Sequence, residues 1–273
     1  MHAYLRFPGF RKKALTLSYD DGMIFDRRLM EILDANGIKA TFNLNSATYG
    51  HPRRFSREEA VALYKDAPHE IACHGAHHIS LSEVDSATAT RDILLDRQDH
   101  ERTYDRIVRG HAYANGDYND QAVEVLRQCG IVYARTVDDS LSFEIPTDWL
   151  RLRPTCHHAN PRLLDLLDKF LEEPPQGGSW KRHCPRLFYV WGHSYEFNDQ
   201  NNWEIIENFA RLAGGHDSVW YATNIEIFEY IKDFEILVYS VDGTIVHNPT
   251  ARTLWYFYNG EISSIAPGET KRV

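Results

Sequence analysis

Short apolar runs alternate with helix-like segments about eight times along the chain, and this alternation limits the folds available to it. Four of the runs are ALTLSYD at 14–20, IKATFNL at 38–44, HEIAC at 69–73 and LFYVWGH at 187–193. The segments between them have helical spacing and recognisable ends, such as the capping-box pattern of Ser56 with Glu59. This pattern is typical of parallel β/α architecture.

The chain divides into two predicted parts. Its 273 residues and even alternation favour a distorted parallel (β/α) barrel of seven to eight strands over an open doubly wound sheet. From Phe234 onward, DG and NG turns separate β-rich runs instead. We therefore predict a barrel over 1–233 and a small antiparallel β appendage over 234–273, packed on or beside it. The segment 174–184, PPQGGSWKRHC, is predicted to be an excursion or lid.

Composition excludes some partners. With 30 basic and 39 acidic residues the formal net charge is -9, which argues against nucleic acid because phosphate backbones select basic surfaces. No apolar run approaches the roughly 20 residues that a bilayer span needs, and the start MHAYLRFPGFRKK has no signal-peptide core. We therefore expect a cytoplasmic protein without a membrane span. A homo-oligomer is compatible with this composition.

Titratable residues gather where the predicted strands end. The first strand ends in Asp20, Asp21 and a glycine, the third is followed by His74 and His78, and the seventh ends at His193. In parallel barrels these ends meet at one face, and its loops carry the chemistry. Two imidazoles with one carboxylate are a common ligand set for a catalytic divalent ion, because three protein ligands leave room for water and substrate.

The adjacent aspartates raise a geometric question. Neighbouring residues of a strand point to opposite faces, so both can face one ion only if the chain turns, which Gly22 permits. One carboxylate can then bind the ion while the other accepts a proton from water. Taken alone, the pair also fits an ordinary turn, since Asp-Gly is a common loop signal. Its placement together with the strand-end histidines favours the site.

The quoted motifs resemble the NodB-homology polysaccharide deacetylases of carbohydrate esterase family 4. SYDDG looks like the first family motif, usually T-F-D-D-G, HGAHH with the downstream SLS looks like the second, and YVWGH looks like the last. The resemblance runs from about residue 12 to residue 232 and implies a distorted (β/α) barrel. It implies that Asp20 is the general base and His193 the general acid. By the same resemblance Asp21, His74 and His78 hold a divalent ion, zinc in the first place, with cobalt, nickel or manganese as alternatives.

The third motif departs from the family. The usual R-P-P-[YF]-G supplies an arginine that orients the catalytic aspartate, whereas the matching stretch here is HAYANG at 111–116. Ala112 stands where the arginine would be. Arg109 and Arg153 are the candidates to supply the charge from neighbouring positions, and a backbone donor near Asn115 is the candidate to hold the oxyanion.

A second set of residues is predicted to bind substrate. The stretch DWLRLRPTCHH loosely resembles the fourth motif and contributes a tryptophan and a histidine. Aromatic side chains can stack on a sugar ring, although they more commonly pack in a core. The predicted set is Tyr113, Asn115, Trp149, His157, Trp191 and Tyr195.

Together these features predict a metal-dependent deacetylase that hydrolyses carbon–nitrogen bonds other than peptide bonds. Its partner would be an N- or O-acetylated carbohydrate or another small N-acyl substrate. One alternative is an amidohydrolase of the same fold acting on a non-sugar amide. Another is a non-catalytic carbohydrate-binding or scaffold protein that uses the β appendage as its interface. The presence of Asp20, Asp21, His74, His78 and His193 argues against the second alternative.

Overall fold

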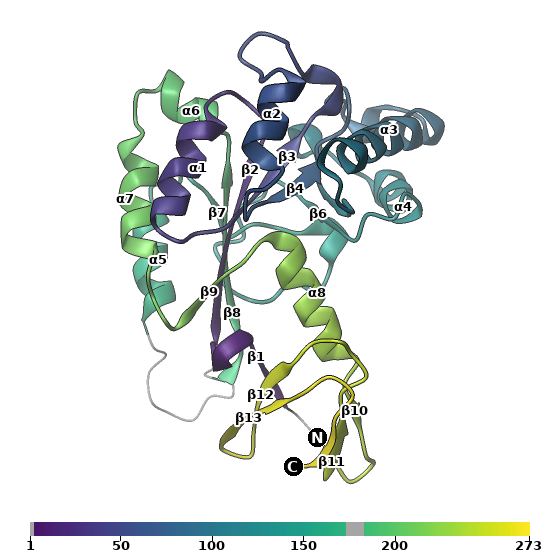
Figure 1. The fold of residues 1–273 in the computed structure, drawn as a ribbon, viewed down its shortest axis with the longest axis vertical. Coiled ribbons are helices and arrows are strands. Elements are labelled where there is room, and N and C mark those ends of the chain that lie inside the picture. Colours follow the sequence, from purple (N-terminus) through teal and green to yellow (C-terminus); the bar gives the residue numbers. More distant parts are fainter. Residues whose placement is uncertain (1–2, 173–182) are drawn as a thin grey trace.

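A computed structural model describes residues 3–172 and 183–273 of the chain (Figure 1). The β/α part occupies the upper two thirds of this view, and antiparallel strands lie below it, near both chain ends. The excursion predicted at 174–184 falls outside the described residues, except for its last two.

The central sheet contains eight strands, and all of its pairings are parallel. Its order is β6-β5-β4-β3-β2-β8-β7, with β9 also paired to β2. The upper part of β2 pairs with β3 and its first residues with β9, so these two strands share one edge of β2. The strands are β2 (Lys13–Asp20), β3 (Ala40–Leu44), β4 (Glu70–Cys73), β5 (Gly110–Ala112), β6 (Tyr133–Arg135), β7 (Cys156–His157), β8 (Arg186–Gly192) and β9 (Val219–Tyr221). This half-barrel confirms the predicted distorted parallel barrel.

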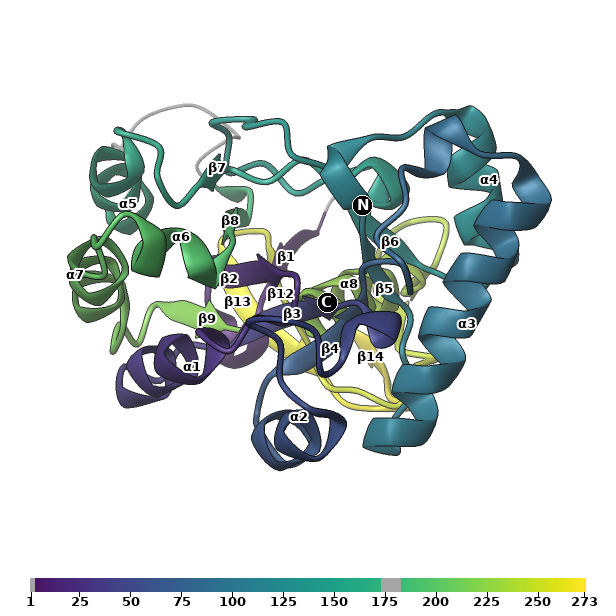
Figure 2. The ribbon, with the colours of Figure 1, turned by 90° about the horizontal axis from the view of Figure 1, so that it is seen from above.

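Helices surround the half-barrel on its outer side (Figure 2). They are α1 (Asp26–Ala35), α2 (Arg57–Tyr64), α3 (Ser86–Tyr104), α4 (Asp120–Gln128), α5 (Leu163–Leu171), α6 (Ser194–Asp199) and α7 (Glu204–Ala213). The last helix, α8 (Asn224–Glu235), lies instead between the half-barrel and the antiparallel strands (Figure 1). The predicted capping box at Ser56 is formed, and Thr223 forms a second one with Glu226 at the start of α8. Of the helices in the described part of the chain, none has the length and apolarity needed to cross a membrane.

Two local sequence patterns differ from the structure. Ser82 with Asp85 resembles a helix start, but Asp85 caps α3, because its side chain accepts the N–H groups of Ala87 and Thr88. The stretch LRLRPTC at 150–156 resembles one strand, but Leu152 forms an isolated bridge with Arg135 and regular pairing begins at Cys156 of β7, after Pro154, which has no N–H to donate to a ladder.

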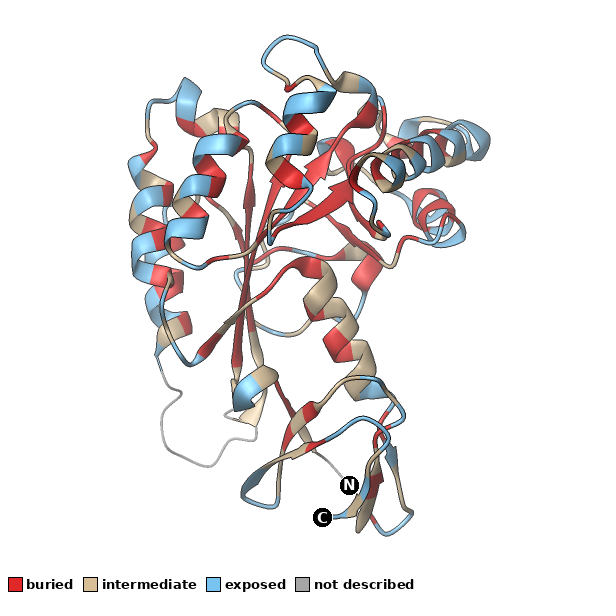
Figure 3. Cartoon of the chain, viewed as in Figure 1, coloured by how far each residue is buried: buried red, intermediate tan, exposed pale blue. Residues whose placement is uncertain are grey.

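Every residue of β2 is buried, and the two faces of the strand differ (Figure 3). Leu15, Leu17 and Tyr19 pack in the main hydrophobic core. The alternate residues are polar: Thr16 donates a hydrogen bond to Asn224, and Ser18 accepts one from Asn43. The period of two therefore places a polar interior inside the half-barrel, and this interior leads up to Asp20.

The appendage consists of two three-stranded antiparallel sheets, as predicted. Their orders are β1-β12-β13 and β10-β11-β14. The strands are β1 (Tyr4–Arg6), β10 (Val238–Tyr239), β11 (Ile245–His247), β12 (Leu254–Tyr258), β13 (Glu261–Ile265) and β14 (Thr270–Arg272). The first strand of the chain thus joins a sheet made mostly of its last strands. Tyr230 of α8 links β1 to β12, since its hydroxyl donates to the Arg6 carbonyl and accepts from the Trp255 N–H.

Candidate active site and metal centre

The turn after β2 separates the two adjacent carboxylates. Asp21 has a φ of 81° and Gly22 a φ of 61°, so the chain leaves the strand in the left-handed region. A Cβ at Gly22 would lie 2.9 Å from Leu44 Cδ2, which leaves room there for glycine only. The strand ends at Asp20, which stays in the barrel interior, while Asp21 turns toward the end of β4. This is the turn that the Asp-Asp-Gly pattern predicted.

Asp21, His74 and His78, the ligand triad, converge at one point. Asp21 Oδ1 lies 3.8 Å from His74 Nε2 and 3.6 Å from His78 Nε2. One ligand atom from each of the three residues lies within 4.8 Å of the other two. Zinc bonds to such atoms are about 2.0–2.2 Å long, so an ion fits between atoms spaced in this way.

The surroundings of His74 give it the protonation that a metal ligand needs. Its Nδ1 lies 2.8 Å from the carbonyl oxygen of Ala112, and because a carbonyl only accepts, Nδ1 carries the proton. The lone pair of Nε2 is then directed toward Asp21. The backbone is fixed as well, since the His74 N–H donates to Asp96 and its carbonyl accepts from Asn45.

His78 has a matching electrostatic environment. Burial, followed by the charge of His74, lowers the pKa of His78 despite the opposing effect of Asp21 and Asp20. A lowered pKa favours the neutral imidazole, the form that binds metal. Arg54 Nη2 lies 3.5 Å from Asp21 Oδ1, so a cation borders the ligand triad on one side. The donor set and its protonation therefore fit a divalent ion.

Asp20 is buried and held at both of its oxygens. Its side chain is 3% exposed, Oδ1 accepts from Asn43 Nδ2 at 2.8 Å, and Oδ2 accepts from Arg135. Burial alone raises the pKa of Asp20, but the charges of Arg135, His74 and His193 outweigh it and lower this pKa to about 2. Asp20 is consequently a carboxylate with fixed orientation at neutral pH.

Arg135 replaces the arginine missing from the third motif. It pairs in register with Ala112 of β5, and side chains of paired residues on parallel strands point the same way. The small Ala112 side chain therefore leaves space that Arg135 fills from β6. The buried guanidinium stacks over Trp191, 4.5 Å from the ring centroid, and donates to Asp20.

This finding corrects the two predicted substitutes. Arg109 pairs with Glu229 at 2.5 Å, near α8 and the opposite end of the half-barrel. Arg153 Nη2 lies 3.5 Å from the carbonyl oxygen of Asp139. Neither arginine contacts Asp20. Their nearness to the third motif in the sequence was misleading, because strand pairing, and not sequence distance, decides which side chain shares the interior.

His193 approaches the same oxygen of Asp20 as His74 does. Its Nε2 lies 3.9 Å from Asp20 Oδ2, and its Nδ1 lies 3.2 Å from Glu196 Oε1. Burial lowers the pKa of His193, but the hydrogen bond to Glu196 and the charges of Asp20 and Asp21 raise it overall. The imidazolium, which can donate a proton, is thereby favoured near neutral pH.

The other predicted residues divide into three groups. Trp191 and Tyr195 border His193, with ring centroids 5.8 and 5.0 Å from its own. Asn115 follows β5 with a φ of 59°, and its side chain donates to Ser80. Tyr113 and Trp149, in contrast, pack in hydrophobic cores. The structure does not bring the side chains of these last two to the site.

His157 lies beside the site but faces Glu196. Its Nε2 is 3.1 Å from Glu196 Oε2, and its ring packs edge-on against Trp191 at 4.6 Å. The adjacent His158 also points to Glu196 Oε2, at 2.9 Å. Sequence reasoning had not included His158, Glu196, Arg135 or Asn43 in the site. Each is a polar residue at or just beyond the end of a predicted strand, which is the signal that could have identified them.

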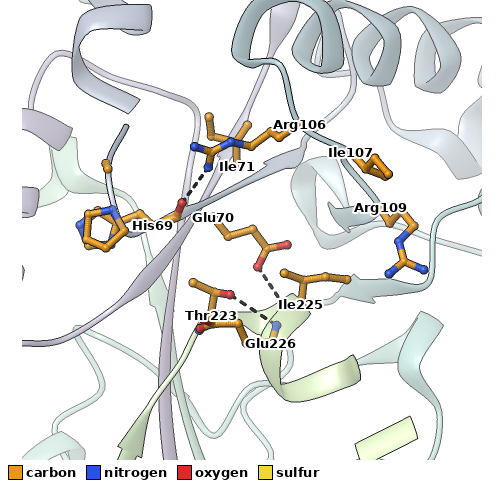
Figure 4. A pocket seen from close by; sticks show the side chains of 11 residues that line it. His69, Glu70, Ile71, Arg106, Ile107, Arg109, Thr223, Ile225 and Glu226 are labelled. Atoms are coloured by element: carbon orange, nitrogen blue, oxygen red, sulfur yellow. Dashed lines mark hydrogen bonds between the residues drawn. The ribbon is translucent and has the colours of Figure 1, made fainter. Parts of the chain in front are cut away.

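A cavity of about 290 Å³ lies elsewhere, at the amino ends of the strands (Figure 4). Glu70, the first residue of β4, borders it and accepts a hydrogen bond from the N–H of Ile225 in α8. Arg106 donates to the carbonyl of His69 on another side. This cavity is at the opposite end of the half-barrel from Asp20, and its lining includes Arg109 but neither the ligand triad nor Asp20 nor His193.

Comparisons with known proteins agree with this geometry. Residues 8–134 match the family model of the polysaccharide deacetylases. No curated protein matches the chain. Among solved structures, a protein described as a polysaccharide deacetylase from Mycobacterium smegmatis is similar at a TM-score of 0.60 and 18% identity, covering 86% of this chain and 95% of that one.

Two further structures share the fold. A family 4 carbohydrate esterase from Streptomyces lividans, in complex with acetate, has a TM-score of 0.51 and 15% identity, covering 78% of this chain and 93% of that one. A family 4 pseudoenzyme from Bacillus anthracis has a TM-score of 0.50 and 17% identity, covering 82% of this chain and 68% of that one. Residues 8–134 thus resemble the polysaccharide deacetylases, and the half-barrel has the same fold as their solved structures.

Proposed function

We propose that this protein is a metal-dependent deacetylase that removes acetyl groups from small N-acetylated sugars. The observation that carries the proposal is the position of Asp20. Its Oδ2 lies 3.9 Å from His74 Nε2 of the ligand triad and 3.9 Å from His193 Nε2. A candidate base is thus within reach of both a candidate metal centre and a candidate acid, as hydrolysis of an amide requires.

A divalent ion held by Asp21, His74 and His78 would supply an activated water and polarise the acyl carbonyl. Asp20 accepts the proton of that water. Its low pKa makes it a weak base, but it keeps the carboxylate ionised over the whole neutral range. Arg135 and Asn43 hold the two oxygens of Asp20, so the base does not have to be ordered during the reaction.

His193 completes the reaction. The amine of an amide departs poorly as an anion, and an imidazolium within reach can protonate it. The raised pKa of His193 favours that charged form. Trp191 and Tyr195 flank the histidine and offer flat apolar surfaces of the kind on which sugar rings pack.

An acetate-release screen tests the proposal. The protein is freed of metal with a chelator, reloaded with zinc, cobalt, nickel or manganese, and incubated with small N-acetylated sugars and with non-sugar N-acyl amides. We expect release from the sugars in the reloaded protein and none after chelation. Release from the non-sugar amides alone would favour an amidohydrolase. A protein that retains metal but releases no acetate from any substrate would be a non-catalytic relative.

A further inference from the structure

A second group of titratable side chains lies next to the site. It comprises His157, His158, His193 and Glu196, which we call the histidine–glutamate cluster. His193 precedes α6 and Glu196 stands in the first turn of that helix, three residues on. Glu196 Oε1 is hydrogen-bonded to His193 Nδ1 at 3.2 Å. The other oxygen, Oε2, lies 3.1 Å from His157 Nε2 and 2.9 Å from His158 Nε2.

The proton positions distinguish this cluster from a metal site. The N–H of Ala159 donates to His157 Nδ1 at 3.1 Å, so Nδ1 is the acceptor and Nε2 carries the proton. A metal ligand needs the reverse, with a bare Nε2. His158 Nε2 lies 2.9 Å from the same carboxylate oxygen, a distance that favours a protonated nitrogen because two lone pairs would repel each other. Both contacts are ion-pair distances to Glu196 Oε2, and neither N–H is aligned to form a hydrogen bond with it.

His158 is rigidly held. It is 2% exposed and packs against the rings of Phe197 and Tyr19, at centroid distances of 4.1 and 5.8 Å. A Cβ at Gly192 would come within 1.9 Å of its Nδ1, so the glycine before His193 makes the space that this ring occupies. One side of Glu196 is consequently fixed by a side chain that cannot move without disturbing the core.

These contacts determine the orientation of His193. With Oε2 of Glu196 facing the histidine pair, Oε1 remains to accept from His193 Nδ1, and this aims His193 Nε2 at Asp20. Tyr195 and Trp191 border the ring on its other sides. We propose that Glu196, fixed by His157 and His158, is a positioning residue that sets the tautomer and orientation of His193. This inference rests on the proposed function only where it refers to the proton donor.

The Glu196→Gln variant tests it. Glutamine keeps the shape of glutamate but replaces one carboxylate oxygen with an NH₂ group. This NH₂ group must face either His193 or the pair His157 and His158, and an N–H there has no acceptor, so one of the two contacts is lost. We expect turnover of an N-acetyl amide to fall about 10- to 100-fold, a usual size for the loss of an orienting partner. Turnover of an activated aryl acetate should be largely retained, because its leaving group hardly needs a proton. Equal losses on both substrates, or no loss on the amide, would overturn the inference.

A matched control is Glu207→Gln. Glu207 forms an exposed pair with Arg28 at 2.8 Å and is not part of the cluster, so its substitution should leave both rates unchanged. Glu196→Asp, which keeps the charge but shortens the side chain, is the second test. It should lower amide turnover selectively, and a loss shared equally by both substrates would count against positioning.

Nitrogen-15 NMR of the imidazole rings supplies a readout that needs no turnover. Neutral His193 should carry its proton on Nδ1 in the wild type, and this tautomer should lose its predominance in Glu196→Gln. An unchanged tautomer would overturn the inference even if the protein hydrolyses acetamides. A wild type without activity but with the expected tautomer change would refute the proposed function alone. A selective shift of the His157 ring nitrogens on addition of one equivalent of zinc would show a metal site in place of the cluster.

Discussion

Two groups of histidines flank Asp20, and they differ in the partner of one ring nitrogen. In the ligand triad, His74 Nδ1 faces a carbonyl oxygen, that of Ala112. In the histidine–glutamate cluster, His157 Nδ1 faces an N–H, that of Ala159. The first contact frees Nε2 for a metal, and the second places a proton on Nε2. Similar side chains thus acquire opposite chemistry from one backbone group.

The difference shows why a cluster of ligand-type residues is not enough to identify a metal site. Both groups bring three His or carboxylate ligand atoms within 4.8 Å of one another. Only the ligand triad has a lone pair directed at its carboxylate, as the partner of His74 Nδ1 establishes. The predictions below test this contrast, beginning with the largest expected effect.

His74→Ala should abolish metal binding and turnover together, because the triad loses one of three ligands. His157→Ala should keep a full complement of metal. Elemental analysis of both variants after reloading with zinc and gel filtration checks this pair. Loss of metal from the His157 variant, with metal retained in the His74 variant, would mean that the histidine–glutamate cluster and not the ligand triad binds the ion.

Asp20→Asn should keep the metal and lower turnover about 10²- to 10⁴-fold, the usual contribution of a general base or acid. Asparagine preserves the shape but cannot accept the proton. Asp66→Asn, at an exposed position on the helix-side surface, is the matched control and should change neither quantity. Metal loss in the Asp20 variant would mean that the roles of Asp20 and Asp21 are exchanged.

His193→Ala should lower amide turnover on the order of 100-fold and impair hydrolysis of an activated ester far less. Because the donor must be protonated, wild-type amide turnover should fall as the pH rises through the pKa of His193. That pKa is raised, so the alkaline limb should lie above about 6.5, the ordinary value for histidine. Equal impairment on amide and ester would indicate a packing role for His193.

Arg135→Ala should lower turnover about 10- to 100-fold, because Asp20 loses its orienting partner. Breaking this buried pair should also raise the pKa of Asp20 and lower the unfolding free energy by about 3–5 kcal/mol. Adding Ala112→Arg to the same chain should restore part of the turnover, since the two positions are in register on adjacent strands. If a folded double variant recovered no turnover, an arginine at position 112 of β5 could not replace Arg135 of β6 as the partner of Asp20.

Gly192→Ala should have the smallest effect, a loss of about 1–3 kcal/mol of unfolding free energy from overpacking. The added methyl group would press on His158. Combining it with His158→Ala should cost less than the sum of the two single changes, because the second removes the clash. Chemical denaturation of all three variants measures this coupling, and strict additivity would contradict the proposed contact.

Periodicity and capping made much of the fold predictable. The alternation in ALTLSYD marked β2 and placed Asp20 at its end, and the pairing of Ser56 with Glu59 marked the start of α2. The Asp-Asp-Gly turn followed from the freedom of Gly22. Each of these signals lies within a few residues, so the sequence shows it directly.

The partners of the site residues depend on contacts between distant segments. Arg135 reaches Asp20 only because β6 pairs with β5 in a register that sets it beside Ala112. Glu196 contacts His157 at the end of β7 and His158, the next residue. No local pattern records a strand register, so candidates at strand ends can be named from the sequence, but not which of them meet.

The pairing of β1 with β12 bears on the order in which the chain can fold. Tyr4 faces Phe257 and Arg6 faces Trp255, so this sheet joins two segments roughly 250 residues apart in the sequence. Contacts of such high sequence separation form slowly, and during synthesis residues 4–6 wait for their partner strand until residues 254–258 have emerged. The half-barrel between these two segments can assemble before then. Pairing of β1 with β12 is thus expected to follow assembly of the half-barrel, so protection of these backbone N–H groups would report that the intervening chain has already been made.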